Sequence, residues 1–177
     1  MELKEALNIR RSIRSYTGEL PTDEQLSAIL TAAYEAPIGM GKYDSIQLTV
    51  ISQRALLGEL DENAARFFGN PSMHPLYGAP MLIVVSSDSE GNIASANAGF
   101  ILQNMSLAAV AEGVGHCIIY GAIAALDQNK DLLKKLDLPE GFTPLGALAV
   151  GKTDEAYTIR KIPDAHKFKM STIKETI

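Results

Sequence analysis

The sequence predicts a single domain, residues 1–177, in which helices and strands are mixed. Two kinds of hydrophobic pattern support this prediction. Apolar residues recur at helical spacing in several stretches, and short continuous apolar runs at 81–85 and 144–150 are typical of strands. A chain of this length can bury a sizeable core without disulfides, which its one cysteine could not form within the chain.

The first half of the chain divides clearly into elements. A short helix comes first, and the run Ile9–Tyr16 closes it. Thr22 and Gln25 form a capping box that begins an amphipathic helix. That helix ends before Pro37, because a residue preceding proline avoids the helical region. We then expect a strand at 46–51, a helix at 54–68, an irregular loop at 69–80 and a central strand, covered on both faces, at 81–85.

The longest predicted helix covers residues 96–112 and ends at Gly113, which suits the left-handed position after a helix. It is apolar on several faces, as is typical of a helix in a core or a subunit interface. A strand at 116–120, a helix from Asp127 to Leu136 and a strand at 144–150 follow. The polar tail 152–177 has no core stripe, so it either stays unfolded or is held by a partner subunit.

Charge is distributed unevenly along the chain. The net charge is −5, yet residues 1–16 carry four Lys/Arg against two Asp/Glu, and residues 152–177 carry six against four. If the two ends meet in space, they form a local positive site on a negative body. Such a site suits a small anion and does not suit nucleic acid, which requires a broad basic face.

The basic residues of the first segment are concentrated in I-R-R-S-I-R-S-Y, where Arg10, Arg11 and Arg14 surround Ser12. A cation in the last turn of a helix interacts favourably with the helix dipole, which explains one arginine. For three arginines around a hydroxyl we favour an anion clamp, because guanidinium groups match phosphate oxygens in bidentate geometry.

Residues 36–45, A-P-I-G-M-G-K-Y-D-S, form a loop with two interpretations. It is either an ordinary helix-to-strand connection or a place where glycines let the backbone approach a flat ligand. Its G-M-G-K is not a nucleotide motif.

No metal-binding or nucleophile motif is present. The three histidines are far apart in sequence and no C-x-x-C occurs, so no metal is expected. We expect His74 to be a surface hydrogen-bonding residue and Cys117 a packed thiol. Any difficult chemistry therefore needs a cofactor. The single cysteine, an N-terminus without an apolar leader and the lack of an 18-residue apolar run favour a cytoplasmic protein without a membrane span.

In their order and spacing, these motifs resemble those of the nitroreductase family of flavoproteins over nearly the whole chain. R-R-S-x-R at 10–14 resembles the family's first flavin-binding motif, and A-P-x-G at 36–39 resembles the start of its second, A-P-S-G-x-N-x-Q-P-W. Further matches are Ala79-Pro80, Gly113 to Cys117, Gly121, and Gly151 followed by Arg160-Lys161. The sequence departs from the second motif at Ile38, Gly41, Tyr43 and Asp44-Ser45, where the family has Ser, Asn, Gln and Pro-Trp.

The resemblance implies an α+β fold, a three-layer sandwich with a mostly antiparallel sheet between helices. It also implies an intertwined homodimer, with FMN in the interface and C-terminal tails that cross to the partner. The FMN phosphate would meet Arg10, Arg11, Ser12 and Arg160 or Lys161, and Arg14 would lie near flavin N1 and C2=O. The other expected flavin contacts are Pro37, Ile38, Gly39, Met40, Tyr120 and Gly121, with the Gly121 N–H facing N5. The Tyr120 hydroxyl either donates into the site or is satisfied in the core.

The implied activity is that of an FMN-dependent NAD(P)H oxidoreductase. NADH or NADPH passes hydride to flavin N5, and an electron-poor acceptor such as a nitroaromatic or quinone then takes it in ping-pong order. Two alternatives remain. The departures in the second motif are consistent with a non-catalytic FMN-binding or flavin-carrier protein. A relative acting on an unusual substrate, such as a reductive dehalogenase or a flavin-fragmenting enzyme, is the other.

Overall fold

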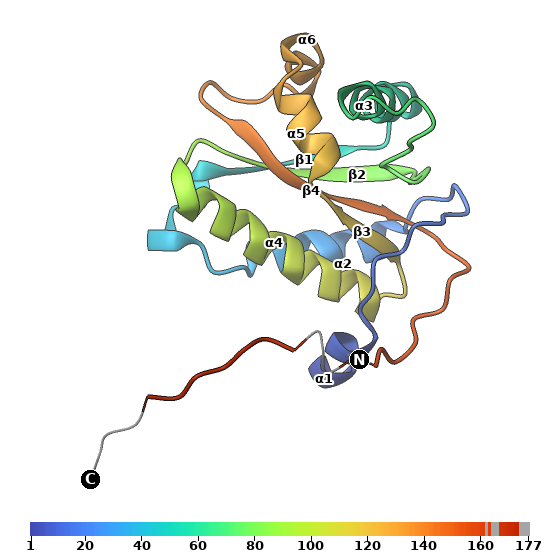
Figure 1. Cartoon of the computed structure of the whole chain (residues 1–177), viewed down its shortest axis with the longest axis vertical. Helices are drawn as coiled ribbons and strands as arrows, with labels where there is room; N and C mark the ends of the chain where they lie inside the picture. The colour runs from blue at the N-terminus through green and yellow to red at the C-terminus, as the bar shows by residue number, and fades with distance from the viewer. Residues whose placement is uncertain (162, 164–166, 174–177) are drawn as a thin grey trace.

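A sheet of antiparallel strands forms the centre of the molecule (Figure 1). The computed structural model describes residues 1–161, 163 and 167–173. Within these residues the sheet has four strands in the order β1-β2-β4-β3, and every pairing is antiparallel. The strands are β1 (Ile46–Ile51), β2 (Met81–Ser87), β3 (Gly115–Ile119) and β4 (Thr143–Gly151). The predicted antiparallel sheet is thereby confirmed.

Helices cover both faces of the sheet, which gives three layers (Figure 1). One face is covered by α3 (Arg54–Phe67), α5 (Gly121–Asp127) and α6 (Lys130–Leu133), and the other by α2 (Asp23–Tyr34) and α4 (Gly91–Ala111). Strand β2 shows why both faces need cover. All seven of its residues are buried, with Leu82 and Val84 in the α3/α5 cluster and Ile83 in the α2/α4 cluster. The prediction of a central strand covered on both faces is confirmed.

The start of α2 follows from local sequence. The Gln25 backbone N–H donates to the Thr22 hydroxyl (3.3 Å), and the Thr22 N–H donates to the Gln25 side-chain oxygen (2.9 Å). This is the predicted capping box. The Gln25 side chain also donates to the Glu112 carbonyl (2.9 Å), so the same residue ties the start of α2 to the end of α4.

Helix α4 begins at Gly91, five residues before the predicted start. Its N-cap, Glu90, makes no side-chain capping bond, so the sequence carries no start signal there. The helix ends as predicted, with Gly113 at φ +68°. By length and composition α4 could cross a membrane, but half of it is buried inside the domain, where it packs against α2 and the sheet.

Two further predicted boundaries are wrong. Helix α1 (Leu3–Ile9) ends before the arginines, because Arg10 has already left helical geometry at ψ 123°. Asp127 ends α5 and does not cap a helix. The next helix is capped by Asn129, whose side chain accepts from the Leu132 N–H (3.1 Å). Short 3-10 turns, η1 (Gly39–Gly41), η2 (Tyr43–Ser45) and η3 (Lys134–Leu136), complete the described elements.

Candidate functional site

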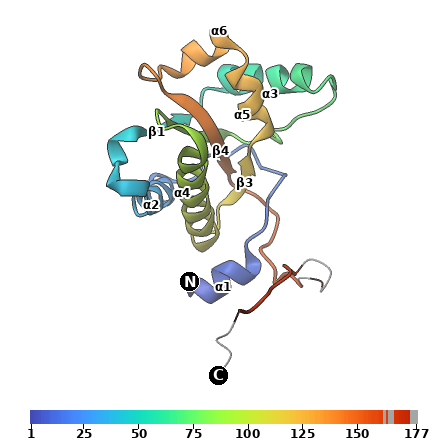
Figure 2. The same ribbon diagram turned by 60° about the vertical axis from the view of Figure 1, so that its left-hand side comes forward.

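The two ends of the chain meet at the β3 side of the sheet. The Ile13 N–H donates to the His116 carbonyl of β3 (2.8 Å), and the Thr17 N–H donates to the Lys152 carbonyl (3.0 Å). The Thr153 hydroxyl donates to the Ser15 carbonyl (2.8 Å). Residues 152–161, which we call the C-terminal strap, therefore run beside the N-terminal segment (Figure 1 and Figure 2). The two basic ends of the chain thus lie side by side in space.

Two arginines from opposite ends of the chain come together where the strap reaches α1. The Arg160 N–H donates to the Asn8 carbonyl in the last turn of α1 (3.1 Å), which places Arg160 near Arg10. Partial burial and the positive charge of Arg160 together lower the pKa of Arg10. Neither arginine forms an ion pair with another described residue. Like charges held this close repel each other unless an anion lies between them, so the arrangement is typical of an anion site.

Other members of the predicted clamp have different surroundings. Ser12 is half-buried, and its hydroxyl has no partner among the described residues. Lys161 is exposed next to Arg160. Arg11 already has an acidic partner, because its guanidinium lies 3.3 Å from a carboxylate oxygen of Glu155. The donor set that remains for an anion, two guanidinium groups and a hydroxyl, fits a phosphate ester.

Arg14 lies against Tyr77, a residue that the sequence did not indicate. The Arg14 guanidinium carbon is 5.5 Å from the centre of the tyrosine ring, and a hydrogen bond with Tyr77 raises the pKa of Arg14. Tyr77 has φ +55°, a left-handed conformation that costs free energy for a bulky residue. Such strain is found more often at functional sites than elsewhere. A Tyr-Gly pair in a loop signals only a turn in sequence, so this contact was not predictable.

A buried histidine also lies near the clamp. His116 is fully buried, with Nε2 2.6 Å from the Ser106 hydroxyl and Nδ1 2.7 Å from the Tyr157 hydroxyl. Burial and the charge of Arg10 lower the pKa of His116 to about 4, so the ring is neutral near pH 7. No pattern in the sequence connects a strand histidine with a tail tyrosine.

The second family motif lies elsewhere. In the loop 36–45, the Gly39 N–H donates to the Asn97 side chain (3.0 Å), and a Cβ at Gly39 would be 2.5 Å from the Ile93 Cδ1. Within this chain, the absence of a side chain at Gly39 lets the loop pack closely against the first turns of α4. Pro37 and Ile38 precede it in the same loop, and Met40 is 79% exposed.

This loop does not meet the arginine clamp within one chain. Gly39 packs on Asn97 near the start of α4, whereas α1, which leads directly into the clamp, packs on Val110 near its end. Thirteen residues of helix separate the two positions, about 20 Å at 1.5 Å per residue. A ligand that contacts both segments of one chain would have to extend along that whole distance.

Tyr120 and Gly121 follow β3. Tyr120 is 54% exposed, so the alternative of a core tyrosine is wrong. Gly121 begins α5, and a Cβ there would lie 2.9 Å from the Phe68 ring. Cys117 is buried, as predicted, and His74 is a surface residue bonded to Asp61 (2.8 Å), also as predicted. Among the described residues no group of three or more His, Cys, Asp or Glu could hold a metal ion.

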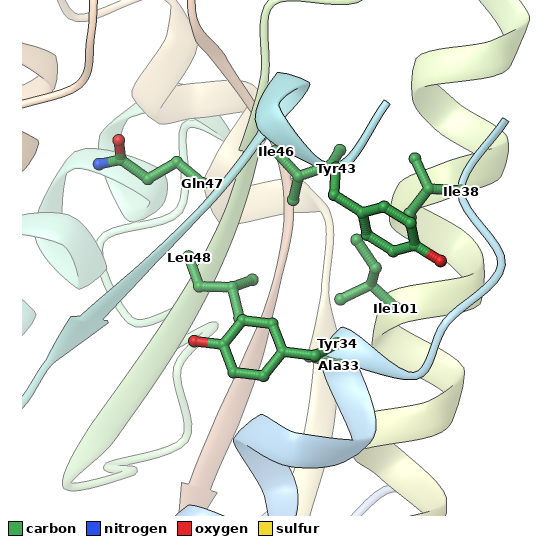
Figure 3. A pocket seen from close by; sticks show the side chains of 8 residues that line it. All are labelled: Ala33, Tyr34, Ile38, Tyr43, Ile46, Gln47, Leu48 and Ile101. Carbon is green, nitrogen blue, oxygen red and sulfur yellow. The ribbon is translucent and has the colours of Figure 1, made fainter. Parts of the chain in front are cut away.

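An apolar groove of about 390 Å³ lies between α2, the loop 36–45, β1 and α4 (Figure 3). Tyr34 and Tyr43 line it, with Ile101 between the two rings, Leu48 beside Tyr34 and Ile38 beside Tyr43. The groove borders the outer edge of β1, and it is separate from the arginine clamp.

Comparison with known proteins places these features in a family. Residues 7–152 match the family model of the Nitroreductase family. Together with the FMN-bound nitroreductases that share this fold, the match defines the class of the protein, an FMN-dependent oxidoreductase. The chain belongs to the nitroreductase family.

Solved structures agree with the assignment. The chain resembles an FMN-bound nitroreductase from Bacteroides fragilis, with 27% identity, a TM-score of 0.83 and coverage of 97% of this chain and 100% of that one. It also resembles an FMN-bound nitroreductase from Desulfitobacterium hafniense (24%, TM-score 0.84, 97% and 100%). A third similar structure is the NADPH:FMN oxidoreductase of Vibrio harveyi in complex with NAD+ (22%, TM-score 0.74, 98% and 79%).

Proposed function

We propose that this chain is an NAD(P)H oxidoreductase that binds FMN through its two chain ends and reduces an electron-poor acceptor such as a nitroaromatic or quinone. Bound FMN would supply hydride transfer, accepting from NADH or NADPH at N5 and delivering to the acceptor in ping-pong order. The observation that carries the proposal is the Arg10–Arg160 pair, two guanidinium groups held together without a carboxylate partner among the described residues.

The chain's own residues would hold and orient the cofactor. Arg10, Arg160, Lys161 and the free Ser12 hydroxyl would bind the phosphate, and Arg11 would contribute less because Glu155 already pairs with it. Arg14, steadied by Tyr77, would present a positive charge to the flavin N1 and C2=O edge. A fixed positive charge there stabilises negative charge on the ring during reduction. Tyr120 and Gly121 would border the ring near N5.

The test is direct. Purified protein should be yellow, and NADH or NADPH should bleach it under anaerobic conditions. A turnover screen across nitroaromatics, quinones and enones then identifies the acceptor class. Colourless protein that does not take up added FMN would contradict the proposal.

A second candidate is a non-catalytic FMN-binding or flavin-carrier protein. It is favoured by the loss of polar family residues in the loop 36–45, where Ile38 and Tyr43 line an apolar groove. This candidate predicts bound FMN that neither nicotinamide reduces at a useful rate, so the same anaerobic experiment separates the two.

We also propose that the protein is a cytoplasmic homodimer whose cofactor site combines two chains. Because the clamp and the loop 36–45 lie about 20 Å apart along α4, each flavin would contact the clamp of one chain and the loop of the other. Ile93 and Phe100 support this, since these α4 residues are 40% and 49% exposed in the single chain.

The tail of each chain would pack on the β1 edge and in the apolar groove of the partner chain. Phe168, Met170 and Ile173 are 97%, 90% and 98% exposed, and this part of the tail extends away from its own domain (Figure 1 and Figure 2). Strand β1 has no partner on its outer side among the described strands, and the apolar groove lies beside it. We propose that the partner's tail adds along this edge and places apolar side chains in the groove.

A further inference from the structure

Resting on the proposed FMN binding, we propose that Tyr157 is a positioning residue. Its hydroxyl, held by His116 and Val114, fixes the C-terminal strap so that Arg160 stands beside Arg10 at the phosphate. We call Ser106, His116, Tyr157 and the Val114 carbonyl the latch.

The hydrogen bonds of the latch run in one direction. The Val114 carbonyl can only accept, so the single Tyr157 hydroxyl proton is donated to it (2.7 Å). The Tyr157 oxygen then accepts from the Nδ1–H of His116 (2.7 Å). In a neutral imidazole this leaves Nε2 as the acceptor for the Ser106 hydroxyl (2.6 Å). Every polar group of the latch is satisfied when His116 is neutral.

The latch rests on the rigid core. Ser106 and His116 are fully buried, in α4 and β3 respectively, and Val114 is 1% exposed between them. The rings of His116 and Tyr157 also stack, with centroids 5.9 Å apart and planes 23° from parallel. Tyr157 is thereby the half-buried anchor of a strap whose following residues, Thr158 to Lys161, are all exposed.

This anchor is close to the proposed phosphate site. Two residues separate Tyr157 from Arg160, and Arg10 lies near enough to influence the pKa of both Tyr157 and His116. Since the Arg160 side chain has no ion-pair partner among the described residues, its position depends on the strap backbone, which is held at Tyr157 and by the bond from the Arg160 N–H to the Asn8 carbonyl (3.1 Å). Loosening the strap at Tyr157 should therefore leave Arg160 held only by its exposed bond to the Asn8 carbonyl, which weakens its hold on the phosphate and leaves the flavin-ring contacts in place.

The experiment compares Tyr157→Phe with Arg160→Gln and the double variant, measuring affinity for FMN, riboflavin and inorganic phosphate. Tyr157→Phe keeps the ring but deletes the hydroxyl. We expect about a tenfold loss of FMN affinity, the size of one charge-assisted hydrogen bond, and riboflavin affinity unchanged within about twofold. Tyr157→Phe should add no further loss in the Arg160→Gln background, because coupled residues are not additive. Thr158→Ala, which deletes an exposed hydroxyl on the same strap, is the matched control and should behave as wild type.

Equal losses for FMN and riboflavin would show a general structural role and overturn the proposal. So would a Tyr157→Phe effect that is undiminished in the Arg160→Gln background. If the wild-type protein binds neither flavin, the proposed function fails, and inorganic phosphate decides the latch alone. Thermal stabilisation by phosphate that is lost in both single variants supports the role of the latch. The same stabilisation in all variants, or no stabilisation of the wild type, contradicts it.

Discussion

Arg10 and Arg11 are adjacent in sequence, but their surroundings predict different effects. Arg10 faces Arg160, whereas Arg11 is paired with Glu155. Arg10→Ala should weaken FMN binding by roughly 1.5–3 kcal/mol, about ten- to hundredfold, because it deletes a charge-assisted phosphate contact. Arg11→Ala should cost less than about 1 kcal/mol, as is usual for a partly exposed ion pair.

Titration of the two apoproteins with FMN and with riboflavin measures both effects. Riboflavin affinity should change little in either variant, because it lacks the phosphate. A larger FMN loss in Arg11→Ala than in Arg10→Ala would mean that Glu155 moves away and Arg11 takes the phosphate.

His116 predicts a pH dependence of stability. Its pKa is about 4 in the folded protein and about 6.5 when unfolded, so the unfolded chain binds more protons between these values. The free energy of unfolding should therefore fall as the pH drops from about 6.5 towards 4, by up to about 1.4 kcal/mol per pH unit from this group. Above pH 7 the group contributes no further change.

Urea unfolding at fixed protein concentration across pH 4 to 7.5 measures this slope. Because carboxylates also begin to titrate at the acid end, His116→Gln serves as the reference. The variant should lose the part of the slope between pH 5 and 6.5. An unchanged slope in His116→Gln would assign the dependence to other groups.

At the scale of single residues, the sequence predicted which residues belong to the clamp better than it predicted which residue each arginine contacts. Three arginines around a serine, with a basic tail, indicated an anion site, because charge and residue type are visible in sequence. That Arg11 is neutralised by Glu155, and that Tyr77 supports Arg14, depends on long-range packing, for which no local spacing gives a signal.

Close packing between elements predicts opposite effects for two glycines. At Gly151, the end of β4, a Cβ would lie 2.4 Å from the rigid Pro80 ring, whereas at Gly58 in α3 nothing lies within 4 Å. Gly151→Ala should destabilise the protein by about 1–3 kcal/mol through overpacking. Gly58→Ala should stabilise it by up to about 1 kcal/mol, because alanine favours a helix over glycine.

Thermal and urea unfolding of the two variants provide the comparison, each serving as the control for the other. If Gly151→Ala is as stable as wild type, the β4 end and Pro80 can separate at no cost, and the close approach is not a packing constraint.

The success of element prediction depended on whether a local signal existed. The capping box of α2 was predictable because both of its bonds lie within four residues. The start of α4 and the whole of α5 were not, since neither has a capping side chain and α5 is apolar almost throughout. The cap of α6 is Asn129 and not the predicted Asp127; both residue types are common helix caps, and they lie two positions apart.

For the whole molecule, the proposed homodimer predicts the effect of removing the tail. Truncation after Gly151 deletes Tyr157, Arg160, Lys161 and the exposed apolar residues of the tail. Both the dimer and FMN content should be lost, because an interface of roughly 2,000–5,000 Å² and half of the phosphate site leave together. Light scattering and flavin absorbance on one sample measure both losses.

A milder change separates the two roles of the tail. Phe168→Asp should weaken the dimer and leave the clamp residues in place, so FMN affinity per assembled dimer should be retained. A truncated protein that stays dimeric and fully yellow, or a full-length monomer that retains FMN, would contradict the two-chain site.

The meeting of the chain ends also determines when the cofactor can be loaded during synthesis. Arg10 leaves the ribosome early, but Arg160 is translated 150 residues later, a delay of roughly 7 to 30 s at 5–20 residues per second. A nascent chain would therefore lack half of the proposed phosphate contacts until residues 160 and 161 have been translated. FMN added to ribosome-bound chains that stop before residue 160 should therefore not be retained.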